Sequence, residues 1–170
     1  MEIGSGTGAN LRHYPPAVTE VVATEPDPHM FKRLPKAAAR AGVPVRLGQV
    51  GADRLPFRDS SVDTVVTTLV LCSVPDQAAA LAEALRVLKP GGRLLFMEHV
   101  RSDDPKIAAK QDKRERFHMR VAGGCHPNRD TLAAIGAAGF EVEQAERARF
   151  PGPKITRPHI SGVATKPAVD

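Results

Sequence analysis

A glycine-rich segment near the start of the chain has the residue types that bring a backbone close to a bound ligand. Glycines stand at positions 4, 6 and 8, and Glu2 precedes the first of them. Alternating glycines let the backbone turn tightly and leave no side chain between it and a ligand. The pattern predicts a loop between a strand and a helix. Since only residues 1–3 precede this loop, we expect a truncated first strand.

Two kinds of nucleotide cofactor fit this loop. Gly4, Gly6 and Ala9 match G-x-G-x-x-A, which is typical of nicotinamide cofactor folds. Glu2, Gly4, Gly6 and Gly8 match E-x-G-x-G-x-G, the loop of the class I S-adenosylmethionine methyltransferases. The carboxylate of Glu2 favours the second cofactor, because it could receive an ammonium group and would repel a pyrophosphate.

Two later segments suit a nucleoside. Glu25 lies 21 residues after Gly4 at the end of an expected strand, where a carboxylate can accept both ribose hydroxyls. Residues 51–57 resemble the D-A-E-x-L-P-F stretch that surrounds adenine in many small-molecule methyltransferases. There Asp53 would accept from the adenine amino group and the Ala52 amide would face a ring nitrogen. Gly51 departs from that pattern, which often has an acid at this position.

Two further segments extend the likeness. Residues 61–66 resemble the S-F-D-x-V start of a fourth strand, and residues 86–92 match the R-V-L-K-P-G-G turn before a fifth. With these motifs in order, residues 1–100 resemble the class I methyltransferases, whereas the dehydrogenase alternative accounts for the glycine loop and Glu25 alone. The resemblance implies S-adenosylmethionine as methyl donor and S-adenosylhomocysteine as product.

Other segments resemble the membrane-associated alkyl thiol S-methyltransferases, which are related to the C-methyltransferases of quinone biosynthesis. They are residues 7–10, 14–16, 68–74, 96–100, 124–125 and 157–160. This resemblance implies a Rossmann-like α/β fold, a seven-stranded mostly parallel sheet with an antiparallel last strand. Those relatives carry an apolar N-terminal anchor without counterpart here, and a tryptophan-rich segment where this chain has the charged residues 106–120.

The residues expected to bind the cofactor match the motifs or end the neighbouring strands: Glu2, Gly4, Ser5, Gly6, Thr7, Gly8, Asn10, Glu25, Pro26, Ala52, Asp53, Leu69 and Cys72. For Cys72 the alternative is a small buried hydrophobic residue. No metal ion is expected.

Four residues are candidates for the chemistry. Glu98 and His99 end the fifth expected strand, where open α/β sheets place ligands. His99 is the first candidate for a base or acceptor-binding group, and the alternative is a histidine fixed by backbone hydrogen bonds. Arg157 and His159 precede the last strand. Arg157 could bind an anionic acceptor or stabilise a thiolate, the reactive form of a thiol, or could form a surface salt bridge.

The pattern of apolar residues and turn signals predicts alternating strands and helices. Strands are expected near residues 1–3, 20–24, 43–47, 62–71, 93–100, 140–145 and 160–166, and helices near 8–13, 28–41, 76–88 and 128–138. Pro35 should kink or split its helix. The apolar run 62–71 predicts a strand buried on both faces. Residues 89–92 predict a turn, and residues 102–120 a solvated helix or a mobile lid.

Length and composition limit the class of protein. A chain of 170 residues predicts one domain over 1–170, without N-terminal cap helices. No apolar run reaches the roughly 20 residues that span a bilayer, and two cysteines give no disulfide framework, so we expect a cytoplasmic protein. Seven aromatic residues leave little to stack bases on, which argues against nucleic acid as a partner. A homodimer stays open.

Three functions follow from these observations. The first is methyl transfer to a small molecule, with a thiol favoured. The second is C- or O-methylation of a quinone, phenol or lipid-like acceptor. The third is a truncated, catalytically weak domain that serves as an interaction module.

Overall fold

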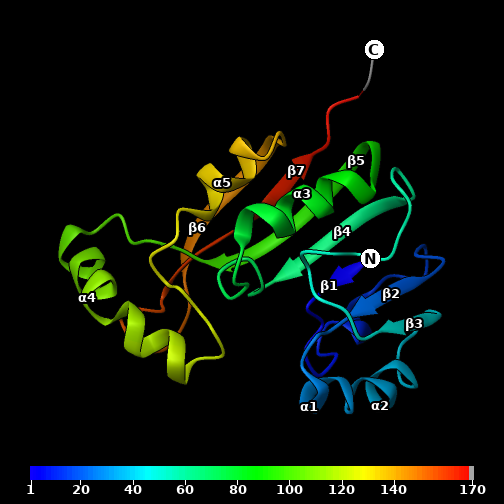
Figure 1. Cartoon of the computed structure of the whole chain (residues 1–170), viewed down its shortest axis with the longest axis horizontal. Coiled ribbons are helices and arrows are strands. Elements are labelled where there is room, and N and C mark those ends of the chain that lie inside the picture. Colours follow the sequence, from blue (N-terminus) through cyan, green and yellow to red (C-terminus); the bar gives the residue numbers. More distant parts are fainter. Residues whose placement is uncertain (169–170) are drawn as a thin grey trace.

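The computed structural model describes residues 1–168, so the last two residues of the predicted domain range 1–170 lie outside the described part. Seven strands form one sheet in the order β3-β2-β1-β4-β5-β7-β6 (Figure 1). The strands from β3 to β5 pair in parallel, whereas β7 runs antiparallel to both β5 and β6. This arrangement confirms the predicted sheet with its antiparallel last strand.

The elements follow the alternating order that the sequence predicts. The strands are β1 (Glu2–Ile3), β2 (Val21–Thr24), β3 (Val45–Gly48), β4 (Val62–Thr68), β5 (Leu88–His99), β6 (Glu141–Arg149) and β7 (Pro158–Thr165). The helices are the 3-10 turn η1 (Leu11–His13), α1 (Pro28–Phe31), α2 (Leu34–Ala38), α3 (Gln77–Val87), α4 (Pro105–Val121) and α5 (Thr131–Ala137).

The strand β1 is short but central. Its residue Glu2 pairs with Ala23 of β2 on one side and with Val66 of β4 on the other. The strand order reverses at this point, because β2 and β3 continue to one side and β4 and β5 to the other. In open α/β sheets the crevice outside the carboxyl ends of such strands is the usual ligand site.

Aspartate caps and prolines set where the helices begin and end. Asp76 accepts a hydrogen bond from the Ala79 amide at 2.9 Å and so caps the start of α3. Asp104 and Asp130 cap α4 and α5 in the same way. The expected helix over 28–41 is split into α1 and α2, and Pro35 lies in the first turn of α2.

The main core lies between α3, α5 and the β4–β5–β7 part of the sheet (Figure 1). Its fully buried side chains include Val65, Leu81, Leu94, Ile135 and Ile160. A second cluster around Leu11, Val21 and Leu34 fixes η1 and α2 against the β2 side. Among the described residues, no helix combines the length and the hydropathy required to cross a membrane.

The structure corrects two expectations about strands. The prediction that 62–71 is buried on both faces is wrong: Val65 and Thr67 are buried, but Val66 and its neighbours on the other face are only half-buried. That face opens onto a groove of about 320 Å³ lined in part by Val66, Leu95 and Met97. The strand also stops at Thr68, because Leu69 has a left-handed backbone conformation with φ of 58°.

The predicted turn over 89–92 is part of β5, not a separate turn before it. The pairing of β4 with β5 shifts register here, from Val62 opposite Leu88 to Thr64 opposite Arg93. The Gly91 amide donates to the Lys166 carbonyl, and the Lys166 amide donates to the Gly92 carbonyl. The bulge is therefore held by the residue that follows β7.

Candidate active site

A cavity of about 710 Å³ lies outside the carboxyl ends of β1, β2, β4 and β5. From the first third of the chain it is lined by Ile3, Gly4, Gly6, Glu25, Pro26, Asp27, Met30 and Ala52. From the rest of the chain it is lined by Thr68, Leu69, Val70, Ser73, Val74, Pro75, His99, His118, Ala122, Gly123, Cys125 and Thr156. Its size and mixed lining suit a small-molecule ligand.

The glycine turn forms one wall of this cavity. Gly4, Gly6 and Gly8 have φ values of 63°, 56° and 83°, a conformation that residues with a side chain rarely adopt. A Cβ atom on Gly6 would meet only the Met30 sulfur, at 3.8 Å, so the backbone there is open to the cavity. A Cβ atom on Gly8 would come within 2.5 Å of the Ala37 Cβ. Gly6 is thus the glycine that leaves room for a ligand, and Gly8 is required by packing.

Glu25 extends this wall from the end of β2. The side chain is buried, and its two carboxylate oxygens accept hydrogen bonds from the Gly6 amide at 2.8 Å and the Asp27 amide at 2.9 Å. A carboxylate has about four acceptor positions, so two remain for other donors. Because Glu25 also lines the cavity, these two free acceptor positions fit the two hydroxyl donors of a ribose, as S-adenosylmethionine would present them.

Glu2 lies behind the glycine turn and does not line the cavity. Its carboxylate is buried and accepts hydrogen bonds from the Tyr14 hydroxyl at 2.7 Å and the Asn10 amide nitrogen at 3.4 Å. Burial raises the pKa of Glu2, and the hydrogen bonds from Tyr14 and Asn10 oppose that shift. Asn10 also donates to the Thr68 hydroxyl at 3.0 Å. Glu2 and Asn10 therefore tie the turn to η1 and β4.

The remaining residues predicted for the cofactor divide into two groups. Pro26, Ala52 and Leu69 line the cavity, as do Gly4, Gly6 and Glu25. Ser5, Thr7, Gly8, Asp53 and Cys72 are not among its lining residues. Ser5 is buried, with its hydroxyl on the Glu2 carbonyl, whereas Thr7 and Asp53 are exposed to solvent.

Glu98 holds the loop that follows β4. Its fully buried carboxylate accepts hydrogen bonds from the backbone amides of Val70 and Cys72, both at 3.1 Å. Burial, and after it the neighbouring Cys72, raise the pKa of Glu98 to about 8, while the amide donors oppose this shift. Glu98 is not a lining residue, so its contacts position the loop that closes this side of the cavity.

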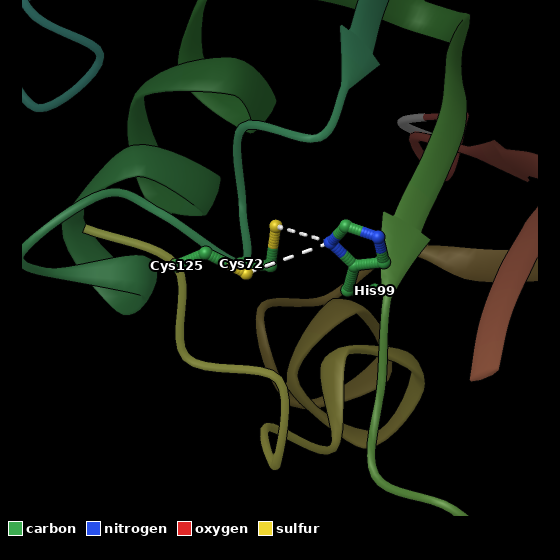
Figure 2. Close-up of side chains that lie close together, drawn as sticks. All are labelled: Cys72, His99 and Cys125. Carbon is green, nitrogen blue, oxygen red and sulfur yellow. Dashed lines mark hydrogen bonds between the residues drawn. The ribbon is translucent and has the colours of Figure 1, made fainter. Parts of the chain in front are cut away.

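Cys72, His99 and Cys125 converge at the same side of the cavity (Figure 2). The His99 Nδ1 atom lies 3.5 Å from the Cys125 sulfur and 4.0 Å from the Cys72 sulfur. A hydrogen bond to Cys125 and burial raise the pKa of the Cys72 thiol to about 12. The same hydrogen bond lowers the pKa of Cys125. Of the two thiols, Cys125 is therefore the one that ionises first.

Arg157 and His159 lie outside the cavity lining. The β5–β7 register sets His159 opposite His99, but its ring stacks on Phe150 with ring centroids 3.5 Å apart. Arg157 is exposed, and its Nε atom donates to the Gly152 carbonyl at 2.7 Å. From this segment the cavity is lined by Thr156 instead.

The charged segment forms the helix α4, and its carboxyl-terminal end reaches the cavity. His118, Ala122 and Gly123 are lining residues. Burial, with the nearby His99 second, lowers the pKa of His118. This helix is anchored by Gln111, which is fully buried and donates through Nε2 to the carbonyls of Val100, Pro127 and Ile155.

Sequence reasoning missed Gln111 and Arg129, which hold the loops around the cavity. The half-buried Arg129 donates through one guanidinium nitrogen to the Leu71 carbonyl at 2.7 Å and to the Val74 carbonyl at 2.8 Å. Both side chains donate hydrogen bonds to backbone carbonyls of other segments of the chain, so no local sequence motif indicates their role. The one sequence signal that could have indicated Gln111 is that it is the only amide side chain in the charged helix α4.

The chain is similar to known methyltransferases in sequence and in fold. The family model described as a methyltransferase domain matches residues 1–96. Thiol S-methyltransferase TMT1B of Rattus norvegicus is 38% identical over 171 residues, an alignment that covers 98% of this chain and 70% of the rat protein. The ubiquinone/menaquinone biosynthesis C-methyltransferase UbiE of Ectopseudomonas mendocina is 32% identical, over 83% of this chain and 64% of that protein.

The solved structures agree in fold. A SAM-dependent methyltransferase from Methanosarcina mazei superposes with a TM-score of 0.78 at 20% identity, covering 99% of this chain and 92% of that chain. At this level of identity the agreement concerns the fold.

Proposed function

This chain belongs to the methyltransferase-domain family of S-adenosylmethionine-dependent enzymes, and on that basis we propose that its methyl acceptor is a small thiol. One observation carries the proposal. A single cavity is lined by the Gly6–Glu25 pair and by the His99–Cys125 pair. The first pair suits the nucleoside of the cofactor, and the second offers an imidazole to an acceptor sulfur. The rat relative, which aligns with nearly the whole of this chain, is named a thiol S-methyltransferase.

The cofactor residues we propose are those that meet the cavity. Glu25 accepts the ribose hydroxyls, the Gly6 backbone leaves room for the ligand, and Ala52 lies where the adenine is expected. Glu2 and Asn10 act from behind the turn by fixing its position. When bound, S-adenosylmethionine supplies a methyl group on a positively charged sulfur.

His99 is the residue we propose to act on the acceptor. A thiol reacts as its thiolate, with an ordinary pKa near 8.5, so a neighbouring group that takes or displaces its proton speeds the reaction. His99 lines the cavity at the carboxyl end of β5. Glu98 keeps the opposing loop in place through the Val70 and Cys72 amides. Alignment of the two reacting groups can contribute roughly 7–11 kcal/mol to such a reaction.

A second acceptor class has its own support. The similarity to a C-methyltransferase of quinone biosynthesis, together with apolar lining residues such as Met30, Leu69 and Val74, suits an aromatic acceptor. Arg157 and His159 do not line this cavity, so we assign neither of them to such an acceptor.

A panel of acceptors tests the proposal. Purified protein is incubated with S-adenosylmethionine that carries an isotopically labelled methyl group, and with small aliphatic thiols, the matching alcohols, phenols and quinols. We expect labelled thioethers from the thiols and no labelled ethers from the alcohols. The Glu25→Ala variant, in which we expect weaker cofactor binding, controls for methyl transfer that does not use the proposed cofactor site. Turnover of a phenol or quinol with no turnover of any thiol would overturn the thiol assignment.

A further inference from the structure

Three ligand atoms of metal-binding type meet at the side of the cavity formed by the ends of β4 and β5. The Sγ atoms of Cys72 and Cys125 and a ring nitrogen of His99 all lie within 4.8 Å of one another (Figure 2). Cys72 is fully buried and Cys125 is 5% exposed, whereas His99 is half-buried and faces the cavity. These residues come from three separate segments, so no local spacing in the sequence indicates the cluster.

The spacing is close to that of a tetrahedral zinc site. With bond lengths of about 2.3 Å to sulfur and about 2.05 Å to nitrogen, a tetrahedron separates sulfur from nitrogen by about 3.6 Å. Here the Cys125 sulfur is 3.5 Å and the Cys72 sulfur 4.0 Å from His99 Nδ1. Both sulfur–nitrogen distances therefore lie within about 0.4 Å of the tetrahedral value, and all three ligand atoms lie within 4.8 Å of one another.

The segments that carry these ligands are already joined by other contacts. The His126 amide donates to the Cys72 carbonyl at 2.7 Å, which links the segment after α4 to the loop after β4. The Cys72 amide donates to Glu98, the residue next to His99. Arg129 holds the carbonyls of Leu71 and Val74 on either side of Cys72. The cluster is therefore preorganised before any ion binds.

We propose that Cys72, His99 and Cys125 form a binding site for a soft divalent metal ion, zinc being the first candidate. Two sulfurs and one imidazole are a donor set that zinc favours, and three protein ligands with an open fourth position are typical of zinc sites that act on a substrate. Since His99 and Cys125 line the cavity, the fourth position faces the space where the acceptor would bind.

This inference deepens the proposed function and rests on it for the identity of the fourth ligand, a substrate thiol. The thiol would lose its proton to solvent as its sulfur binds the ion, because the ion lowers the pKa of the thiol. His99 would then act as a ligand of the ion and not as a base. That sulfur then forms the bond to the methyl carbon, while the bond from this carbon to the donor sulfur breaks and leaves its electron pair on the donor. The product is a neutral thioether, a weaker ligand that leaves the site.

Cobalt substitution tests the metal site without any measurement of turnover. Untagged protein is reduced with a phosphine, freed of metal by dialysis against a chelator, and titrated with Co²⁺. Because the chain contains only two cysteines, a thiolate-to-cobalt charge-transfer band can arise only from Cys72 and Cys125. We expect this band and intense tetrahedral cobalt bands to reach their maximum at one equivalent of Co²⁺. Both should disappear when Zn²⁺ is added and displaces the cobalt. Addition of a small thiol should shift the visible bands, and the matching alcohol should not.

Variants separate this site from other histidines. Cys125→Ser and His99→Ala should weaken Zn²⁺ binding by more than about 100-fold. Removal of a residue that only hydrogen-bonds to a metal ligand already costs about 10- to 100-fold, and these variants remove a ligand itself. His118→Asn, which alters another histidine of the same cavity, should lower Zn²⁺ affinity far less than either ligand variant, because all three bonds to the ion stay in place. Cys72 is fully buried, so Cys72→Ser could also disturb the fold. Its Zn²⁺ affinity is therefore compared with that of the parent protein only if the two proteins bind S-adenosylmethionine equally well.

The outcomes also separate this inference from the proposed function. Absence of the charge-transfer band in reduced protein, or Zn²⁺ binding that persists in Cys125→Ser, would overturn the metal site. Thiol methylation at an unchanged rate after metal removal would overturn its role in the reaction while leaving the thiol assignment intact. A protein that binds Zn²⁺ through these residues but methylates only phenols would retain the metal site and lose the thiol assignment.

Discussion

The Glu25 carboxylate accepts a hydrogen bond from the Gly6 amide at 2.8 Å, so the end of β2 and the glycine turn after β1 form one structural unit. The other Glu25 oxygen accepts the Asp27 amide at the start of α1. The same carboxylate therefore orders the turn and offers its remaining acceptor positions to the cavity. Loss of this side chain would remove the proposed ribose contact and loosen the turn at the same time.

We predict that Glu25→Ala weakens S-adenosylmethionine binding by about 10- to 100-fold, because hydrogen bonds to a charged group contribute about 1.5–3 kcal/mol. Glu25→Gln should lose less, since an amide oxygen still accepts one donor. Isothermal calorimetry measures both affinities. Glu20→Ala is the matched control, because Glu20 pairs with Arg46 at the surface, away from the cavity. Equal affinities for Glu25→Ala and the parent protein would refute the assignment of the ribose contact.

Substitutions of two glycines in the same turn should have different effects. We predict that Gly6→Ala lowers the free energy of unfolding by about 1–2 kcal/mol, the cost of a left-handed conformation, and weakens cofactor binding as its methyl enters the cavity. Gly8→Ala should lose a further 1–3 kcal/mol through overpacking, because the new Cβ would lie 2.5 Å from the Ala37 Cβ.

Urea unfolding and calorimetry on the same samples distinguish these effects. Gly42→Ala is the control, since a Cβ atom there meets nothing within 4 Å. Equal losses of stability in Gly6→Ala and Gly8→Ala would contradict the division between a ligand-facing and a packing glycine.

The pH dependence of stability should reveal the buried Glu2. Burial raises the pKa of this carboxyl above its ordinary 4.5, so in the range just above 4.5 the native protein keeps a proton that the unfolded chain has released. The stability that this group contributes is therefore full below pH 4.5 and is lost as pH rises through the raised native pKa. We predict that Glu2→Gln flattens this part of the curve of unfolding free energy against pH. A slope unchanged from the parent protein would contradict it, and Glu20→Gln serves as the exposed control.

The parts of the site that the sequence predicted are those encoded by short local patterns. Gly4, Gly6 and Gly8 need left-handed backbone conformations, and Glu25 directly follows the strand β2, so each can be identified from its neighbours alone. The alternating pattern predicted the succession of strands and helices, whereas the seven-stranded sheet with its antiparallel last strand was implied by the family resemblance and is confirmed by the structure. The face of β4 was misjudged, because a run of β-branched residues does not reveal which face of a sheet is covered.

Residues whose positions depend on contacts that no motif encodes could not be predicted in this way. His159 and Arg157 were expected near the acceptor, but stacking on Phe150 and the contact with Gly152 hold them elsewhere. Glu98 was expected to take part in the chemistry, yet its contacts are backbone amides 28 and 26 residues earlier in the chain. Cys125 came from the resemblance alone, and its proximity to His99 is a product of the folded chain.

The Gln111 side chain provides the last prediction. Its Nε2 atom donates to the carbonyls of Val100, Pro127 and Ile155, and its Oε1 atom accepts the Ser102 amide at 2.9 Å. Gln111→Ala would leave several of these buried groups without a partner, at a cost of about 1–3 kcal/mol for each that water cannot reach. We predict a loss of about 2–4 kcal/mol in the free energy of unfolding, measured with urea. Lys110→Ala, at an exposed position of the same helix, should change it by less than about 0.5 kcal/mol. A similarly small effect of Gln111→Ala would show that these carbonyls find water when the amide is removed.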